Sequence, residues 1–309
     1  MWIIALIGSA TAFVESTLAQ LFKQKHKDSF IGGPAYYIQR GLHQRWMAVL
    51  FAILITLQFG LSNNSIQANT ICGAMQEAFG WSPVWVAGGG IGATMMNGIK
   101  RGLFSNEAGE GSAPNVAATA TVSHPVKQGL IQALGVFTDT LVVCSCTAFI
   151  ILFSGVDSQG GLNGIALTQA ALEAEIGRFG TIFVAAAILL FAYSSIIGNY
   201  YYGEANIRFL TRNARSASCR KWVMAVYRLL AGGVVVIFGA LASLDLVWSL
   251  GDLCMALLTA CNLYAIARLG KYAFRLLDDY RAQKKAGKNP VFRRDSLPET
   301  AELDLECWE

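Results

Sequence analysis

Residues 98–120 read GIKRGLFSNEAGEGSAPNVAATA, a polar and Gly-rich stretch between two long apolar runs. It places two cations, two acids and two Asn side chains beside small residues. From spacing alone, residues 100–129 form either a loop with a short helix capped by Ser105 or Asn106, or the break in a discontinuous membrane helix. A broken helix exposes backbone N–H and C=O groups that bind a zwitterion and a small cation.

The composition indicates a polytopic membrane protein. Of the 309 residues, 54% are hydrophobic and only 14% are charged, whereas about a quarter of the residues in a soluble domain are charged. Several apolar runs approach the roughly 20 residues needed to cross a bilayer. The net charge of +4 is modest and does not favour a nucleic-acid partner.

The apolar runs predict an all-α bundle of about seven transmembrane spans. The predicted transmembrane domain covers residues 1–277, and a charged cytoplasmic tail, expected to be partly disordered, covers residues 278–309. The predicted spans are 2–22, 46–78, 84–99, 130–154, 179–203, 222–241 and 246–268.

Basic residues alternate between successive loops. Lys and Arg are concentrated in the segments 23–45, 100–127 and 204–221, whereas the loops 79–83 and 242–245 have none. Because positively charged loops stay in the cytoplasm, this pattern predicts an N-terminus outside the cell and a cytoplasmic C-terminus. The chain is therefore expected in the plasma membrane, with lipid around it.

Several polar residues interrupt the apolar runs. In a membrane such groups must face other helices or a water-filled cavity, since lipid cannot hydrogen-bond them. Each one alone is equally consistent with interhelical hydrogen bonding, but together they favour a polar pathway. They are Glu15, Asn63, Asn64, Gln67, Asn69, Asp139, Ser194, Ser195 and Asp252.

Enzymatic chemistry has no support in the sequence. The three histidines, His26, His43 and His124, all lie in predicted loops. They form no metal-ligand spacing on a helix, and no nucleophile–base arrangement is visible. A membrane-embedded enzyme is the weakest hypothesis, and no organic cofactor or resident metal is expected.

The opening stretch and its neighbours resemble the alanine/glycine:cation symporter (sodium:alanine symporter) family. The resemblance rests first on GIKRGLFSNEAGEGSAPNVAATA and the following HPVKQGLIQALGVFTDTLVVC. It extends to GGPAYYIQRGL at 32–42, SIQANTI at 65–71, FAYSSIIGNYYYGEAN at 191–206 and DYRAQKKAGKNPVF at 279–292. It covers nearly the whole chain, from Trp2 to about Phe292.

The resemblance implies a LeuT-like inverted-repeat transporter. Such a protein would carry a small neutral amino acid, alanine or glycine, together with Na⁺, or H⁺ in some members. In that fold the opening stretch is similar to a discontinuous core helix, with its Gly-rich part in the outer half and KRGLFSNEAG beginning the inner half.

Site residues follow from the resemblance, motif by motif. Gln67 matches a position that contacts the substrate, and Phe104 resembles the aromatic wall of the pocket. Ser195 stands where relatives usually have a Thr that lines the substrate and cation region, and Ser194 offers a second cation oxygen. Asn199 stands where relatives commonly have Trp, which puts the usual limit on substrate size in doubt. Asp139 and Asp252 also fall in family motifs, with expected structural or gating roles.

Two departures from the family pattern affect the expected activity. Residues 1–22 resemble the second core helix, so the first discontinuous helix has no counterpart. In addition, QEAFGWSPVWVAGGG at 76–90 joins the end of the third core helix to the start of the sixth, so the fourth and fifth are missing. The first hypothesis is therefore a symporter by descent, and the second is a transport-inactive remnant or a non-transporting membrane partner protein.

Overall fold

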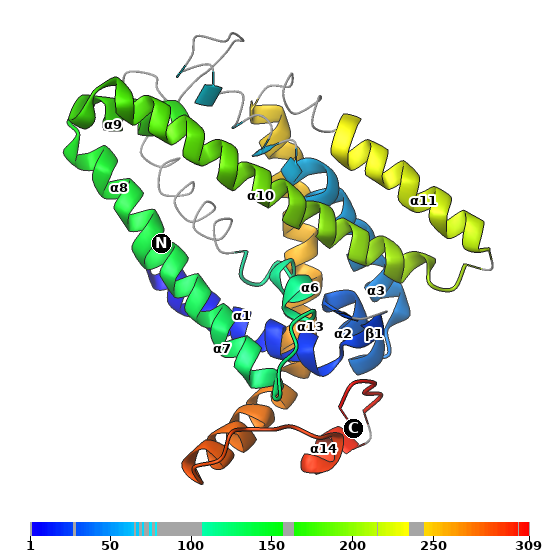
Figure 1. Ribbon diagram of the computed structural model, residues 1–309. Coiled ribbons are helices and arrows are strands. Elements are labelled where there is room, and N and C mark those ends of the chain that lie inside the picture. Colours follow the sequence, from blue (N-terminus) through cyan, green and yellow to red (C-terminus); the bar gives the residue numbers. More distant parts are fainter. Residues whose placement is uncertain are drawn as a thin grey trace.

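The computed structural model is a helical bundle (Figure 1). It describes residues 2–26, 29–64, 66, 67, 70, 74, 75, 78, 107–156, 164–214, 216–234, 244–301 and 303–308. Within these ranges the only strands are β1 (Gln24–His26) and β2 (Ser29–Ile31), which pair antiparallel with Lys25 opposite Phe30. The predicted all-α class is confirmed.

The helices vary widely in length. The principal α-helices are α1 (Trp2–Leu21), α2 (Pro34–Gly41), α3 (Arg45–Leu57), α6 (Ala113–Ala117), α7 (Pro125–Phe137), α8 (Cys144–Phe153), α9 (Ile165–Ile176), α10 (Arg178–Thr211), α11 (Ala217–Leu229), α13 (Leu244–Lys285) and α14 (Pro298–Ala301). Three π-helical segments continue them: η1 (Gln58–Asn63) after α3, η2 (Thr138–Val143) between α7 and α8, and η3 (Leu230–Val234) after α11. A 3₁₀ turn, η4, covers Arg294–Ser296.

Four helical stretches in the described part of the chain are long and apolar enough to cross a membrane. They are Arg45–Asn63, Pro125–Phe153, Arg178–Thr211 and Gly251–Lys285. Each overlaps one of the predicted spans. The predicted span 2–22 coincides with α1, and α11 with η3 covers the first part of span 222–241. The predicted span 84–99 lies outside the described residues.

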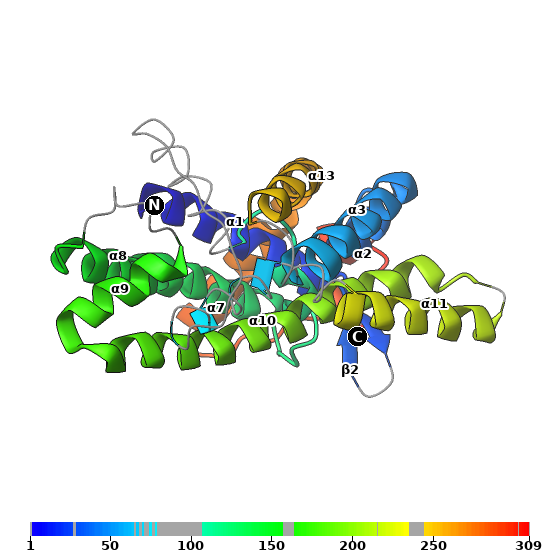
Figure 2. The same ribbon diagram turned by 90° about the horizontal axis from the view of Figure 1, so that it is seen from above.

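The core forms where α1 packs between α7 and α13 (Figures 1 and 2). Phe22, directly after α1, and Leu269 of α13 are fully or almost fully buried in this core, together with Phe51 and Ile55 of α3, which packs on α13. The closest approach of α1 and α7 requires a residue without a side chain at Gly129, because a Cβ atom there would lie 2.8 Å from the carbonyl oxygen of Phe13. The two helices are thus held at backbone contact distance.

Helix α10 runs along one side of the molecule, from α9 to α11 (Figures 1 and 2). Its first turns pack on α9, and its middle packs on α3 and η1. Its last turns lie beside α11, where the hydroxyl of Tyr227 donates to the carbonyl oxygen of Tyr200 at 2.9 Å.

The C-terminal segment folds back on the bundle. After α13, the chain returns past α7, where the amide of Phe292 donates to the carbonyl oxygen of Ser123 at 2.9 Å. Phe292, Leu303, Leu305 and Trp308 are buried in the main core. The partial disorder expected for the tail is therefore not found in this packed part, because four apolar side chains find a surface to bury against.

Candidate functional site

A small polar pocket lies where α10 faces η1 and Gln67. Its volume is about 260 Å³. Polar side chains make up most of its lining: Asn63, Gln67, Glu107, Ser194, Ser195, Gly198, Asn199 and Tyr202. Two of the membrane-length stretches, Arg45–Asn63 and Arg178–Thr211, contribute to its lining. Asn63 and Asn199 are buried by protein, whereas Ser194 is exposed.

One face of α10 supplies most of the pocket. Ser194, Ser195, Gly198, Asn199 and Tyr202 recur at the spacing of neighbouring helix turns, so their side chains project in one direction. Asn199 is almost fully buried, at 4% exposure. A Cβ atom built on Gly198 would meet nothing within 4 Å. The glycine therefore leaves open space beside the amide.

The opposite wall comes from the π-helical end of α3. In η1 the helix is wider than an α-helix, a feature often found at functional sites. The amide of Gln58 donates to Asn63 Oδ1 at 3.5 Å, and the amide of Asn64 donates to the carbonyl oxygen of Gly60 at 3.2 Å. These bonds orient the Asn pair, and Gln67 follows Asn63 by one helical turn on the same face.

The two serines present hydroxyl oxygens to the pocket in a defined way. Ser194 Oγ and Ser195 Oγ both donate to the carbonyl oxygen of Phe191, at 2.7 and 3.0 Å. A hydroxyl that has donated its proton to its own helix keeps its lone pairs free to accept. Such oxygens suit a hard cation, which prefers oxygen ligands.

Glu107 brings the one carboxylate of the pocket lining from a tight turn before α6. Its φ is +51°, and Gly109 and Gly111 also have positive φ, at +93° and +81°. L-residues rarely adopt this conformation, whereas glycine does so freely. The carboxylate of Glu107 accepts a hydrogen bond from the hydroxyl of Ser112, which fixes its position.

The turn is anchored to the bundle by a buried acid of α1. The Glu15 carboxylate accepts from the amide of Gly109 at 3.3 Å and from the side chain of Asn262 at 2.8 Å. The same Asn262 amide donates to the carbonyl oxygen of Gly109 at 2.9 Å. At Gly111 a Cβ atom would lie 2.6 Å from the Pro34 ring. Glu15 thus anchors the turn at residues 109–111, which packs against Pro34 of α2 and Asn262 of α13. Because Glu107 lies just before this turn, its position is set as well.

The structure brings together four of the five predicted site residues. Gln67, Ser194, Ser195 and Asn199 line the same pocket, and Phe104 lies outside the described residues. Asp139 and Asp252 are not among the lining residues of this pocket.

Three further side chains with polar groups line the pocket, those of Asn63, Glu107 and Tyr202, and the sequence predicted no binding role for them. A signal existed for each. Asn63 belongs to the polar cluster that also contains Gln67, and Glu107 belongs to the opening stretch. Tyr202 follows Ser195 by two helical turns.

Membrane-length helices around a small polar pocket define a membrane transport protein of the helical type. A family model described as "Sodium:alanine symporter family" matches residues 1–88 and 85–294. The chain belongs to this family of sodium-coupled amino-acid symporters of the bacterial plasma membrane, and it is not an enzyme.

Three relatives illustrate the range of the similarity. "Probable sodium/glutamine symporter GlnT" of Bacillus subtilis (strain 168) is 46% identical over 376 residues, with 100% of this chain and 76% of the relative covered. "Amino-acid carrier protein AlsT" of the same organism is 41% identical, with 100% and 78% covered. "Sodium/proton-dependent alanine carrier protein" of Bacillus sp. (strain PS3) is 28% identical, with 94% and 82% covered.

The alignments also show an internal difference from the relatives. The first of them spans 376 positions against the 309 residues of this chain, and 376 less 309 leaves 67 positions without a counterpart here. The two matched parts of the family model meet at residues 85–88, within the stretch 76–90, where the sequence predicts that two core helices are missing. Residues 85–88 lie outside the described part of the structure.

Proposed function

We propose that this chain carries a small neutral amino acid, alanine or glycine, into the cell together with Na⁺, and that its C-terminus is cytoplasmic. The single observation that supports this most strongly is the polar pocket between η1 and α10. Its volume of about 260 Å³ is below the roughly 300 to 1,000 Å³ of pockets for drug-sized ligands. A solute with a short side chain suits this space.

The pocket lining offers a partner for each part of a zwitterion. Glu107 supplies a carboxylate for the ammonium group of the solute, held in place by Ser112. The side-chain amides of Gln67 and Asn199 carry N–H donors that suit the solute carboxylate. In this proposal Phe104 adds the aromatic wall that the family resemblance implies.

The cation takes the hydroxyl side of the pocket. Ser194 and Ser195 share one acceptor, the carbonyl oxygen of Phe191, and so both offer lone pairs toward the pocket. Na⁺ bound there would lie near the carboxylate of the solute, which would couple the two binding events electrostatically. Proton coupling is the alternative suggested by the relative named as a sodium/proton-dependent alanine carrier.

Glutamine is a second candidate solute. The relative with 46% identity is named as a probable sodium/glutamine symporter, and an Asn at position 199 leaves more room than the Trp common in the family. The open space at Gly198 points the same way.

Transport by the purified chain tests the proposal directly. The full chain is reconstituted in liposomes with an inward Na⁺ gradient, and uptake of labelled alanine is measured with unlabelled glycine, D-alanine or glutamine as competitors. We expect Na⁺-dependent uptake of alanine that unlabelled glycine blocks. Blocking by glutamine but not by glycine would favour the second solute, and alanine uptake driven by a pH gradient in place of the Na⁺ gradient would favour proton coupling. No uptake of any of these solutes would favour the transport-inactive alternative, which the 67 unmatched positions motivate.

A further inference from the structure

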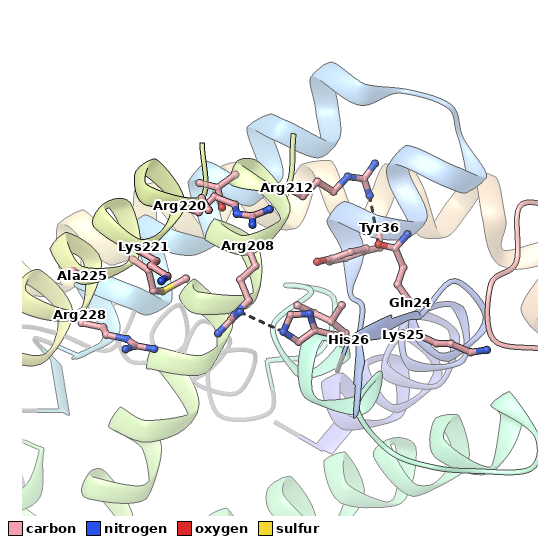
Figure 3. A pocket seen from close by; sticks show the side chains of 14 residues that line it. Gln24, Lys25, His26, Tyr36, Arg208, Arg212, Arg220, Lys221, Ala225 and Arg228 are labelled. Carbon is pink, nitrogen blue, oxygen red and sulfur yellow. Dashed lines mark hydrogen bonds between the residues drawn. The ribbon is translucent and has the colours of Figure 1, made fainter. Parts of the chain in front are cut away.

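A second, larger cavity lies at the C-terminal end of α10, beyond the polar pocket. Its volume is about 800 Å³. Figure 3 shows its walls, which come from the β1 strand, the last turns of α10 and one face of α11. Segments almost 200 residues apart in the sequence therefore meet around one hollow, which sequence proximity alone would not produce.

The lining of this cavity is strongly basic. It contains the six cations Lys25, Arg208, Arg212, Arg220, Lys221 and Arg228, together with His26, and its lining includes no Asp or Glu. Two acids lie close to the lining residues in the described part of the chain. Glu204 pairs with Arg208 and lies 3.9 Å from Arg228, and the Glu306 carboxylate accepts from the backbone amide of Lys25 at 3.1 Å. Two carboxylates cannot balance six cations, so the cavity attracts anions.

Helix geometry aims three of these cations at the cavity. Along α11 the lining residues are Ala217, Arg220, Lys221, Met224, Ala225 and Arg228. This spacing defines a single helix face. Arg220 and Lys221 are exposed and form no ion pair with any residue that the structure describes. They are available to a ligand.

Two further arginines contact side chains of the β hairpin. Arg208 Nη1 lies 3.3 Å from His26 Nε2, and Arg212 Nη1 donates to Gln24 Oε1 at 3.4 Å (Figure 3). The β hairpin thus orients both guanidinium groups. Arg208 is also paired with Glu204, whereas Arg212 forms no ion pair with any residue that the structure describes. Planar guanidinium groups bind phosphate oxygens in pairs.

The alternative explanation is that these cations only set the membrane topology. Topology requires positive charge in a loop but not convergence on one cavity. The cavity also has apolar walls, which include Ile31, Tyr36 and Met224. Next to its basic face, α11 exposes Trp222 and Leu229, each 70% exposed. Trp side chains favour the interface between lipid and water, and basic pockets of this kind bind lipid head groups.

We propose that this basic pocket, between the β hairpin, the end of α10 and α11, binds the phosphate group of an anionic phospholipid. The phosphate lies among Arg208, Arg220 and Lys221, and the acyl chains run along the apolar face of α11. A soluble phosphate has the same head-group chemistry, so the test includes both sources.

The test measures ligand binding to the purified, delipidated full chain by native mass spectrometry. The ligands are phosphatidylglycerol, zwitterionic phosphatidylethanolamine and inorganic pyrophosphate. The variant Arg220→Gln/Lys221→Gln removes two exposed cations of the pocket. The matched control Lys284→Gln/Lys285→Gln removes two exposed cations near the end of α13.

We expect phosphatidylglycerol to bind at least tenfold more tightly than phosphatidylethanolamine. The pocket variant should weaken phosphatidylglycerol binding about thirtyfold, as expected for the loss of two surface cations facing anionic lipid, and the control should change it less than threefold. Equal weakening in both variants, or none in the pocket variant, would overturn the proposal. If pyrophosphate binds as tightly as phosphatidylglycerol, the apolar face of α11 contributes nothing to binding. That result would overturn the proposal that the phosphate group belongs to a lipid.

Discussion

The indole N–H of Trp308 donates to the carbonyl oxygens of Gln20 and Leu21, at 3.0 and 3.1 Å. These carbonyls belong to the last turn of α1, where helix carbonyls lack partners within the helix. Trp308 therefore supplies a hydrogen-bond donor to two carbonyl groups at the C-terminal end of α1. The Trp308 ring also packs edge-on against Phe292, with the ring centroids 5.4 Å apart.

The Trp308 contact predicts that the tail opens when the indole is removed. Truncation of a buried Trp to Ala costs about 3 to 5 kcal/mol, and about 1.4 kcal/mol changes an equilibrium tenfold, so Trp308→Ala should raise the open population at least about a hundredfold. Trypsin cleavage after the exposed Arg293 and Arg294 reports this opening, provided that the tail recloses faster than trypsin cleaves. Trp308→Phe keeps the ring and loses the N–H, so it should give an intermediate rate. Equal cleavage rates in all three proteins would contradict the prediction.

The contact between α10 and α11 predicts different effects for two glycines of α10. A Cβ atom on Gly203 would lie 2.6 Å from Tyr227 Cζ, whereas one on Gly198 would meet nothing within 4 Å. Gly203→Ala should therefore lower the free energy of unfolding by about 1 to 3 kcal/mol, as overpacking does. Gly198→Ala should raise it by up to about 1 kcal/mol, because Ala favours the helix.

Unfolding of both glycine variants by titration with sodium dodecyl sulfate in mixed micelles measures the two free energies. The variants are a matched pair on one helix, so a general effect of Ala on α10 would appear in both. A loss of stability in Gly198→Ala that equals the loss in Gly203→Ala would show that Tyr227 is not the cause.

His124 predicts a loss of stability in acid. Its Nδ1 accepts from the amide of Val126 at 3.2 Å, and its Nε2 lies 3.1 Å from Asp279 Oδ2. The ring is therefore neutral, with its proton on Nε2. Burial lowers the pKa of His124 below its usual 6.5, against the opposing effect of Asp279. A second proton would have to lie on Nδ1, where it would meet the Val126 N–H and break the N-cap of α7.

The sign of the pH dependence follows from this lowered pKa. The unfolded chain binds a proton at His124 more readily than the folded chain, so stability is complete above pH 6.5 and is lost as the pH falls through the lower folded pKa. Thermal melting between pH 7.5 and pH 5 measures it. His124→Asn keeps an acceptor at the N-cap but cannot titrate, so its melting temperature should change less over this range. An identical slope in both proteins would assign the acid effect to other groups.

Ser195 predicts a specific change in the Na⁺ dependence of uptake. Under the proposed function, Ser195→Ala removes one oxygen ligand, so the Na⁺ concentration for half-maximal alanine uptake should rise about tenfold, the effect of about 1.4 kcal/mol of lost binding. Ser195→Thr keeps the oxygen and its bond to the helix, and should differ less than threefold from the parent. Uptake in liposomes at stepped Na⁺ concentrations measures both variants. A tenfold rise in Ser195→Thr as well would assign the effect to packing and not to the hydroxyl.

The local sequence predicted the helical membrane class because that class depends on properties of single segments. Apolar length decides whether a helix such as α10 can cross a membrane, and it requires no knowledge of neighbours. The polar residues were also visible as exceptions to the apolar pattern, and Gln67, Ser195 and Asn199 were placed in one site through family motifs. Glu107 received no role, because the positive φ values that turn it toward the pocket are set by its neighbours.

The sequence by itself determined that this protein is a helical membrane protein, where its apolar segments begin and end, and to which family it is similar. Only the tertiary structure decided that Trp308 closes the end of α1, that Glu107 and Ser195 line one pocket, and that Lys25 and Arg220 line one cavity. The physical reason is the separation along the chain of the residues that interact. Hydropathy and loop charge act residue by residue along the chain, whereas these contacts join residues from about 90 to almost 290 positions apart, and they form only when the packed bundle offers a complementary surface.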